Sequence, residues 1–208
     1  GGKGADLMSV AGNLSAGEIL GGSGSDSVIV SGTLQGSASL YGGSSNITVD
    51  EGDSFTLGAI SVGTVSANDG NDTMIVANDA FKASLYGGSG NDSVSIASNY
   101  SVGVYEGGAG ADTLNVAAAV QGAASLYGGE GDDLMSVASG ITSSAAYGNQ
   151  ANDSIVLSGA SKKASLYGGA GNDSVNAQAL NTNYYLGGLG NDTIVATAAT
   201  STTIYGGS

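Results

Sequence analysis

The sequence contains no cysteine, no proline, no histidine and no tryptophan in its 208 residues. Without cysteine the chain has neither a disulfide framework nor a thiolate metal site. Without histidine as well, zinc lacks its favoured ligands, and the nucleophile–base pairs of common hydrolases lack a base. These absences exclude zinc enzymes and triad hydrolases, and we expect no catalysis by this chain.

Basic residues are equally scarce. Lys and Arg together number 4 against 18 Asp and Glu, which gives a formal net charge of −14. Nucleic acids and anionic membranes both require a basic face, so we expect neither as a partner, whereas cations suit the charge. The apolar runs are too short to span a bilayer, and the opening Gly1-Gly2-Lys3-Gly4 does not resemble a signal peptide.

Glycine is abundant, with 38 residues, and much of it recurs in short clusters. Disorder is not expected, because 41% of the residues are hydrophobic and only 11% are charged, the reverse of a disordered composition. The clusters return every 19 to 21 residues, with a single interval of 25, which predicts a repeat architecture. The repeat units begin at Gly1, Gly21, Gly42, Ala67, Gly87, Gly107, Gly128, Gly148, Gly168, Gly187 and Gly206.

Each unit carries two short runs with strand character. Four or five alternating residues, such as Ser93-Val94-Ser95-Ile96, follow the glycine cluster, and a second run, most often Ala-Ser-Leu-Tyr, precedes the next one. Alternation bounded by glycine predicts half-buried β-strands, and the connections are too long for tight hairpins. We therefore predict an all-β fold, a parallel β-roll or β-helix solenoid of about ten coils with ~20 residues per coil and two parallel sheets. The residues expected to point inward are Val28, Val30, Met74, Val76, Val94, Ile96, Leu114, Val116, Met135, Val137, Ile155, Leu157, Val175, Ala177, Ile194 and Ala196 from the first sheet, and Leu40, Leu85, Leu126, Leu166 and Ile204 from the second.

An aspartate occupies the sixth position of nine units. Stacked coils would bring these carboxylates about 5 Å apart, where like charges repel unless cations lie among them. Glycine permits positive φ, so the turns can direct carbonyl oxygens at one point. Ca²⁺ accepts roughly six to eight such oxygens, whereas Mg²⁺ requires a stricter octahedron. The alternative is that Asp and Asn only stabilise their own turns. The predicted calcium ligands are Asp6, Asp26, Asp72, Asp92, Asp112, Asp133, Asp153, Asp173 and Asp192, with turn glycines Gly88, Gly90, Gly108, Gly110, Gly129, Gly131, Gly169 and Gly171.

Several units resemble a known family. The nine residues from Gly87 (GGSGNDSVS), from Gly107 (GGAGADTLN) and from Gly168 (GGAGNDSVN) are similar to the RTX, or haemolysin-type, calcium-binding repeat Gly-Gly-x-Gly-x-Asp-x-U-x, where U is a large apolar residue. The resemblance implies a right-handed parallel β-roll in which adjacent turns on one edge share each Ca²⁺. It also implies secretion by a type I system and folding after exit into millimolar calcium.

The chain departs from the family pattern in two ways. A typical family roll carries the nonapeptide on both edges, but here alternate turns lack it, as in residues 78–82 (NDAFK), so we predict calcium along one edge only. Ile47 stands where an aspartate belongs, and extra residues from Asp50 to Asp53 follow. We therefore predict a bulging loop and a row of ions that is interrupted or altered, with weaker sites beside it, in an irregular coil at about 42–66. About seven ions are expected, between the pairs 6/26, 72/92, 92/112, 112/133, 133/153, 153/173 and 173/192.

Two other surface patterns suggest alternatives. A tyrosine precedes the glycine pair at Tyr41, Tyr86, Tyr127, Tyr147, Tyr167 and Tyr205. Stacking between coils is favoured over a sugar-binding stripe for these side chains. The outward pair Thr113-x-Asn115 invites comparison with calcium-dependent ice-binding rolls, but the equivalent pairs Ser27-x-Ile29 and Leu134-x-Ser136 form no regular array, so ice binding is disfavoured.

The repeats cover the whole chain, so we predict one RTX-like β-roll array over residues 1–208 that is a segment of a longer protein. The favoured function is a calcium-binding structural repeat module of a secreted bacterial cell-surface protein, such as a surface layer, adhesin or coat, which folds on binding Ca²⁺ outside the cell. The alternative is an accessory export and folding module of a type I-secreted enzyme. Besides calcium, the expected partners are neighbouring repeats or like subunits, end to end or laterally, and a cell-surface polysaccharide.

Overall fold

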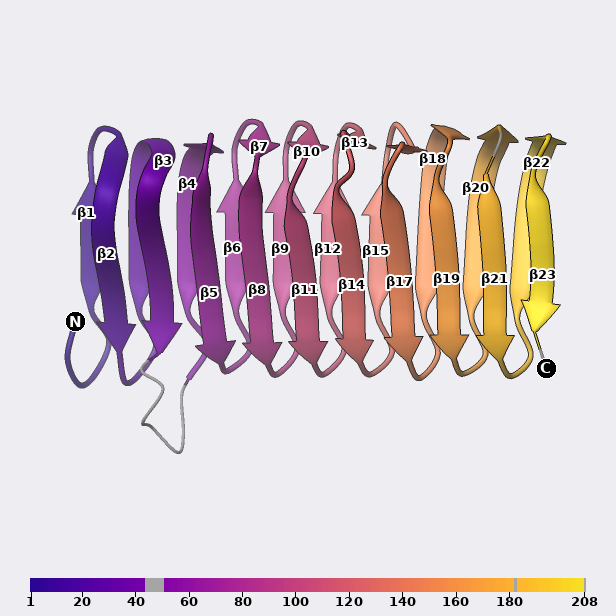
Figure 1. The fold of residues 1–208 in the computed structure, drawn as a ribbon. Helices are drawn as coiled ribbons and strands as arrows, with labels where there is room; N and C mark the ends of the chain where they lie inside the picture. The colour runs from indigo at the N-terminus through magenta and orange to yellow at the C-terminus, as the bar shows by residue number, and fades with distance from the viewer. Residues whose placement is uncertain (44–50, 182, 208) are drawn as a thin grey trace.

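The computed structural model describes residues 1–43, 51–181 and 183–207, which form one parallel β-solenoid (Figure 1). The described residues contain 23 strands and no helix, and therefore no helix that is long and apolar enough to cross a membrane. The coils stand side by side from the N-terminus to the C-terminus, so residues about one repeat apart in the sequence are neighbours in space.

Each coil presents one strand on each of two faces, and some coils add a short strand at the edge that is uppermost in Figure 1. The first face, drawn behind, consists of β1 (Leu7–Val10), the first part of β3 (Ser27–Gly43), β4 (Ser54–Ile60), β6 (Thr73–Val76), β9 (Ser93–Ile96), β12 (Thr113–Val116), β15 (Leu134–Val137), β18 (Ser154–Lys162), β20 (Ser174–Asn181) and β22 (Thr193–Thr200). The second face, drawn in front, consists of β2 (Leu14–Gly22), the last part of β3, β5 (Gly63–Asp69), β8 (Ala83–Ser89), β11 (Val104–Ala109), β14 (Ser125–Glu130), β17 (Ala145–Gln150), β19 (Ser165–Ala170), β21 (Tyr184–Leu189) and β23 (Thr203–Gly207). The upper-edge strands are β7 (Ala80–Phe81), β10 (Tyr100–Ser101), β13 (Val120–Gln121) and β16 (Ile141–Thr142).

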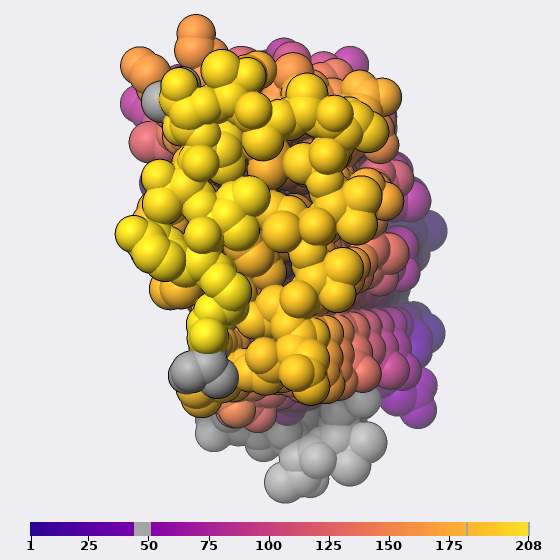
Figure 2. All heavy atoms as spheres, turned by 90° about the vertical axis from the view of Figure 1, so that its right-hand side faces the viewer, coloured from indigo at the N-terminus to yellow at the C-terminus, as the bar shows by residue number. Residues whose placement is uncertain are grey.

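The register places like residues on like residues. Val94 in β9, for example, lies opposite Met74 in β6 on one side and Leu114 in β12 on the other, and both pairings are parallel. Figure 2, which looks along the solenoid, shows equivalent atoms of successive coils in straight rows on its lower face. This parallel stacking confirms the all-β solenoid predicted from the repeat.

The core is a narrow strip of apolar side chains between the two faces. The residues predicted to point inward are at most 1% exposed in every coil before the last one. In the last coil, Ile194 and Ala196 are only partly buried and Ile204 is 45% exposed, because β22 and β23 pair with strands on one side alone.

The short strands of the upper edge were not predicted. They contain two residues each, of which one points inward, as Ala80, Tyr100, Val120 and Ile141 do. Two residues are too few to display the alternation that identifies a strand in a sequence. Their inward side chains close the core at the edge that lacks the glycine clusters.

Outward tyrosines of the second face stack from coil to coil. The ring centroids of Tyr127 and Tyr147 are 4.8 Å apart, and those of Tyr147 and Tyr167 are 4.7 Å apart with rings only 2° from parallel. Tyr184 and Tyr205 extend the column with tilted rings. The stacking between coils favoured from the sequence is confirmed for these residues. The stacked rings face one another, which withdraws their faces from a sugar ring.

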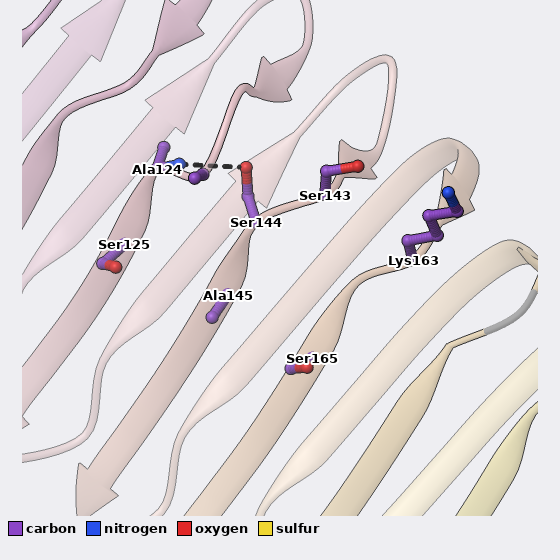
Figure 3. A pocket seen from close by; sticks show the side chains of 8 residues that line it. Ala124, Ser125, Ser143, Ser144, Ala145, Lys163 and Ser165 are labelled. Carbon is purple, nitrogen blue, oxygen red and sulfur yellow. Dashed lines mark hydrogen bonds between the residues drawn. The ribbon is translucent and has the colours of Figure 1, made fainter.

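A shallow groove crosses the same part of the solenoid (Figure 3). Within it the Ser144 hydroxyl accepts a hydrogen bond of 3.1 Å from the Ala124 N–H. The lining includes one charged residue, Lys163, and no acid, so the groove lacks the carboxylate oxygens that a calcium site in a protein usually contains. It is lined by Ala123, Ala124, Ser125, Ser143, Ser144, Ala145, Lys163 and Ser165.

Candidate metal centre

The predicted aspartates lie in the turns at the lower edge of Figure 1, where each second-face strand leads into the first-face strand of the next coil. The backbone N–H of each aspartate donates a hydrogen bond to the Oδ1 atom of the aspartate one coil further along. The donor–acceptor distances are 2.6 to 3.0 Å. The carboxylates therefore form one continuous row, with the links Asp6 to Asp26, Asp26 to Asp53, Asp53 to Asp72, Asp72 to Asp92, Asp92 to Asp112, Asp112 to Asp133, Asp133 to Asp153, Asp153 to Asp173 and Asp173 to Asp192.

The predicted interruption of this row is wrong. Asp53 fills the gap, because its Oδ1 accepts from Asp26 at 2.6 Å and its own N–H donates to Asp72 at 2.6 Å. In the sequence Asp53 follows Gly42 by eleven positions, whereas Asp112 follows Gly107 by five, so Asp53 belongs to the row despite its different spacing. The substitution at Ile47 and the predicted bulging loop lie outside the described residues.

The strand that follows Asp53 identifies it as a member of the row, although its distance from the preceding glycines does not. It is followed by Ser54-Phe55-Thr56-Leu57, the same alternation that follows every other aspartate of the row. Phe55 and Leu57 are buried in register with Met74 and Val76. Alignment from the strand backward, instead of from the glycines forward, would have identified Asp53.

The turn glycines adopt a backbone conformation that other residues rarely reach. All eight glycines predicted as site residues have φ between 116° and 140°. A Cβ added at Gly108 would clash with the Gly88 carbonyl, and one added at Gly129 would clash with the Gly108 carbonyl. Glycine is thus required twice, for its positive φ and for the close approach of a carbonyl from the preceding coil.

The second carboxylate oxygen, Oδ2, is the group that the protein itself leaves unsatisfied. Asp112 Oδ2 is buried and has no hydrogen-bond partner, and a Cβ at Gly107 would clash with this oxygen and with the Gly128 carbonyl of the next coil. A carboxylate and a carbonyl oxygen therefore lie close together beside one glycine. The buried Oδ2 atoms without a hydrogen-bond partner include those of Asp26, Asp92, Asp112, Asp133, Asp153, Asp173 and Asp192.

This donor set fits a hard cation. A buried carboxylate oxygen without a partner is costly, and a cation relieves both that cost and the repulsion along the row. Oxygen-only ligands, part carboxylate and part carbonyl, are those that Ca²⁺ prefers. In the described part of the chain no three acidic, histidine or cysteine side chains converge closely enough to hold one metal ion together, so each position would rely on backbone carbonyls as well as on the row.

Burial changes the acidity of the row. It raises the pKa of Asp92, Asp112 and Asp133 to about 6 and that of Asp153 to about 7. The hydrogen bond from the preceding aspartate's N–H opposes this rise, and neighbouring acids add to it. The pKa of Asp173 is raised for the same reasons. Near neutral pH the row without a cation is therefore partly protonated, and a bound cation would favour the ionised form.

The family model described as the RTX calcium-binding nonapeptide repeat, in four copies, matches residues 84–95, 122–141 and 165–183. Each matched segment contains one aspartate of the row, namely Asp92, Asp133 or Asp173. No curated protein matches the chain.

Among solved structures, the chain is similar to the X-ray crystal structure of a hyperactive, Ca²⁺-dependent, β-helical antifreeze protein from an Antarctic bacterium. The sequences are 20% identical, the TM-score is 0.68, and the match covers 95% of this chain and 69% of the other. At this identity the likeness concerns the fold. Together with the family match, it confirms the resemblance drawn from the sequence: three segments of this parallel β-solenoid are similar to RTX calcium-binding nonapeptide repeats.

Proposed function

We propose that the aspartate row holds a line of calcium ions and that the chain is a calcium-stabilised structural module of a secreted bacterial cell-surface protein. The observation that carries the proposal is the row of buried Oδ2 atoms, each beside a carbonyl oxygen of the next coil. The carboxylates of adjacent coils would hold each ion jointly. The proposed ligands are the nine aspartates predicted from the sequence, together with Asp53 and the carbonyl groups of the turns.

The addition of Asp53 raises the number of adjacent aspartate pairs. With ten aspartates linked in sequence, nine such pairs exist, so we propose up to nine ions in place of about seven. A calcium ion in each position supplies positive charge that offsets the repulsion between carboxylates. The unfolded chain has no preformed site, so the free energy of ion binding contributes directly to folding.

The location of the protein follows from the calcium level that such a fold requires. Extracellular calcium modules bind with dissociation constants of about 10⁻⁴ to 10⁻³ M, well above cytosolic calcium. The proposed module stays unfolded inside the cell and folds outside it. A surface layer, adhesin or coat fits a long solenoid without catalytic residues, with like subunits or a cell-surface polysaccharide as partners.

Ice binding is not proposed, although the similar solved structure is that of an antifreeze protein. The first outward position of the first-face strands is Ser or Thr in most coils, but Leu134 interrupts it. The second outward position varies, as in Ser95, Asn115 and Ser136. The turns of the lower edge are also uneven, because Ser89, Ala109 and Glu130 occupy one position in successive coils. These positions together therefore form no regular paired array.

The proposal is tested by comparing two neighbouring acids of one turn. Asp133 belongs to the row, whereas Asp132 is exposed and accepts hydrogen bonds from Asn152 on the outer surface. We expect the protein to resist subtilisin at millimolar calcium and to be degraded at submicromolar calcium. Asp133→Ala should require several-fold more calcium for protection, and Asp132→Ala should behave as the wild type. Equal protection at both calcium levels would contradict the proposed function.

A further inference from the structure

Two tyrosines interrupt an apolar column inside the solenoid. The inward position two residues before the first glycine is leucine in β8, β14 and β19, but it is Tyr105 in β11 and Tyr185 in β21. The register is unambiguous, because Tyr105 pairs with Leu85 and Leu126, and Tyr185 pairs with Leu166. Both tyrosines are therefore core residues at equivalent places in two different coils.

The hydroxyl groups of these tyrosines are buried and have no hydrogen-bond partner. Each residue is 1% exposed, so water does not reach it from the surface. A buried polar group without a partner costs about 1–3 kcal/mol, and a leucine or phenylalanine would avoid that cost. The third core tyrosine is satisfied, because the Tyr100 hydroxyl donates to the Ala83 carbonyl at 2.9 Å. The missing partner is thus specific to Tyr105 and Tyr185.

Both tyrosines precede an aspartate turn, since each lies two residues before the glycine pair that leads to Asp112 or Asp192. The carboxylates are near enough to act on them: burial and then Asp112, Asp133 and Asp92 raise the pKa of Tyr105 well above its usual value, and burial and then Asp192 and Asp173 raise that of Tyr185 to about 12. The Oδ2 atoms of Asp112 and Asp192 are themselves buried without a hydrogen-bond partner. Buried oxygens without a partner therefore occur both on these core tyrosines and on the aspartates of the turns that follow them.

We propose that the Tyr105 and Tyr185 hydroxyls belong to the calcium sites of their coils, where each supplies an additional oxygen from the core side. This inference rests on the proposed function, since it assigns two more residues to the same row. A phenolic oxygen is a neutral ligand for a hard cation and adds no charge to a crowded row of carboxylates. The row then contains two positions that differ from those beside Leu85, Leu126 and Leu166.

The test uses the calcium concentration at which half the protein is folded, measured for Tyr105→Phe and Tyr185→Phe. Phenylalanine keeps the ring and removes only the hydroxyl. If the hydroxyl contacts the ion, its loss should raise the calcium midpoint about 1.5-fold in each variant, because the lost contact is shared among all the ions whose binding is linked to folding. Tyr105→Leu, which introduces the residue of the neighbouring coils, should raise the midpoint in the same direction. A variant that no longer folds at any calcium concentration would be the extreme of this effect.

The opposite result is equally definite. If the hydroxyls have no part in ion binding, removing a buried group without a partner stabilises the fold, and the midpoint falls or stays unchanged in both variants. That outcome overturns the inference. Tyr147→Phe, in the outward column, is the matched control and should leave the midpoint unchanged. Failure of the proposed function is recognised separately, because the wild type itself would then fold without any dependence on calcium.

A second readout locates the effect. Tb³⁺ substituted for calcium emits when a nearby tyrosine is excited, and Tyr105→Leu and Tyr185→Leu should each remove a large share of this emission. Tyr147→Leu should remove much less, because Tyr147 lies on the outer surface of the second face. Equal losses from all three variants would contradict the position assigned to the two core tyrosines.

Discussion

The two edges of the solenoid place different residues at the turn positions that have positive φ. On the aspartate edge most of these turn positions are glycines with φ from 105° to 140°, as Gly24 and Gly171 illustrate, and the exceptions Gly4, Asn68, Asn149 and Ala151 have φ from 73° to 88°. On the opposite edge, ordinary residues take the left-handed conformation at φ from 47° to 66°, among them Lys82, Val102 and Ala123. Most L-residues tolerate the second region at moderate cost but avoid the first.

Close approach of the backbone explains the difference. On the aspartate edge a carbonyl of the preceding coil occupies the space that a side chain would need, as at Gly108. On the opposite edge the surroundings vary: a Cβ at Gly122 would meet the Val102 side chain at 2.9 Å, whereas one at Gly140 would meet the Ala160 carbonyl at 2.6 Å. Close approach of a carbonyl therefore recurs in most coils on the aspartate edge, and on the opposite edge it occurs only at some glycines.

The largest effect is expected from alanine at the crowded glycine. Gly108→Ala combines an unfavourable φ with a clash against a backbone carbonyl, and we expect a loss of about 4 kcal/mol in the free energy of unfolding with calcium present. Gly122→Ala should cost only about 1 kcal/mol. Chemical denaturation of both variants measures the difference, and equal losses would show that the two edges are equivalent.

Removal of an acid from each edge should separate metal binding from turn stability. Asp53→Ala removes a carboxylate linked to both neighbours in the row, so we expect the number of calcium ions bound at saturation to fall by two. Asp79→Ala removes the acid on the opposite edge that accepts a hydrogen bond from Asn99 at 3.0 Å, and the number of ions should not change. Equilibrium dialysis gives both counts. A normal count for Asp53→Ala would place the irregular turn outside the metal row.

The stability of the calcium-free protein should fall as the pH rises from 4 to 7. The pKa values of Asp92, Asp112, Asp133 and Asp153 rise from 3.8 to about 6 or 7 on folding, so the folded state binds more protons than the unfolded state between pH 4 and 7. Stability without calcium is therefore highest at the acidic end of this range and is lost as the pH rises toward 7. With EDTA present, circular dichroism should show more β-structure at pH 5 than at pH 7.5. Greater structure at pH 7.5 would contradict this reading of the row.

The smallest effect is expected on the opposite edge. Val102 has φ 54°, which is unfavourable for a β-branched residue, so Val102→Asn should raise the free energy of unfolding by about 1 kcal/mol. Val62 occupies the equivalent position two coils earlier and is not among the residues with positive φ. Val62→Asn is therefore the matched control, with no expected gain. Thermal unfolding with calcium present compares the two variants.

The sequence predicted the features that recur from coil to coil, and it did not predict features that occur in a single coil. The sequence period of about 20 residues becomes a set of contacts when the coils stack. From this period follow the strands of both faces, the burial of residues such as Val94 and Leu114, and the position of nine aspartates on one edge. Asp53 was missed because an insertion moved it away from its glycines. Its role depends on contact with Asp26 and Asp72, and spacing along the chain does not reveal such contacts.

The core tyrosines illustrate the same limit. Tyr105 stands two residues before its glycine pair and the outward tyrosines stand one residue before theirs, so the spacing implies opposite faces, but it does not reveal that the Tyr105 hydroxyl lacks a partner. The coil register established that Tyr105 points inward and Tyr147 outward. The short strands of the upper edge were equally hidden, since their pairing depends on the coils before and after them.

The most direct test of the account is a calcium titration of the EDTA-treated protein at pH 7.5, followed by far-ultraviolet circular dichroism, with magnesium in parallel. The account predicts a cooperative transition from coil to β-structure near millimolar calcium and none with magnesium at the same concentrations. An unchanged β-sheet signal with and without calcium would contradict it, because packing alone would then hold the solenoid and the aspartate row would serve only its own turns.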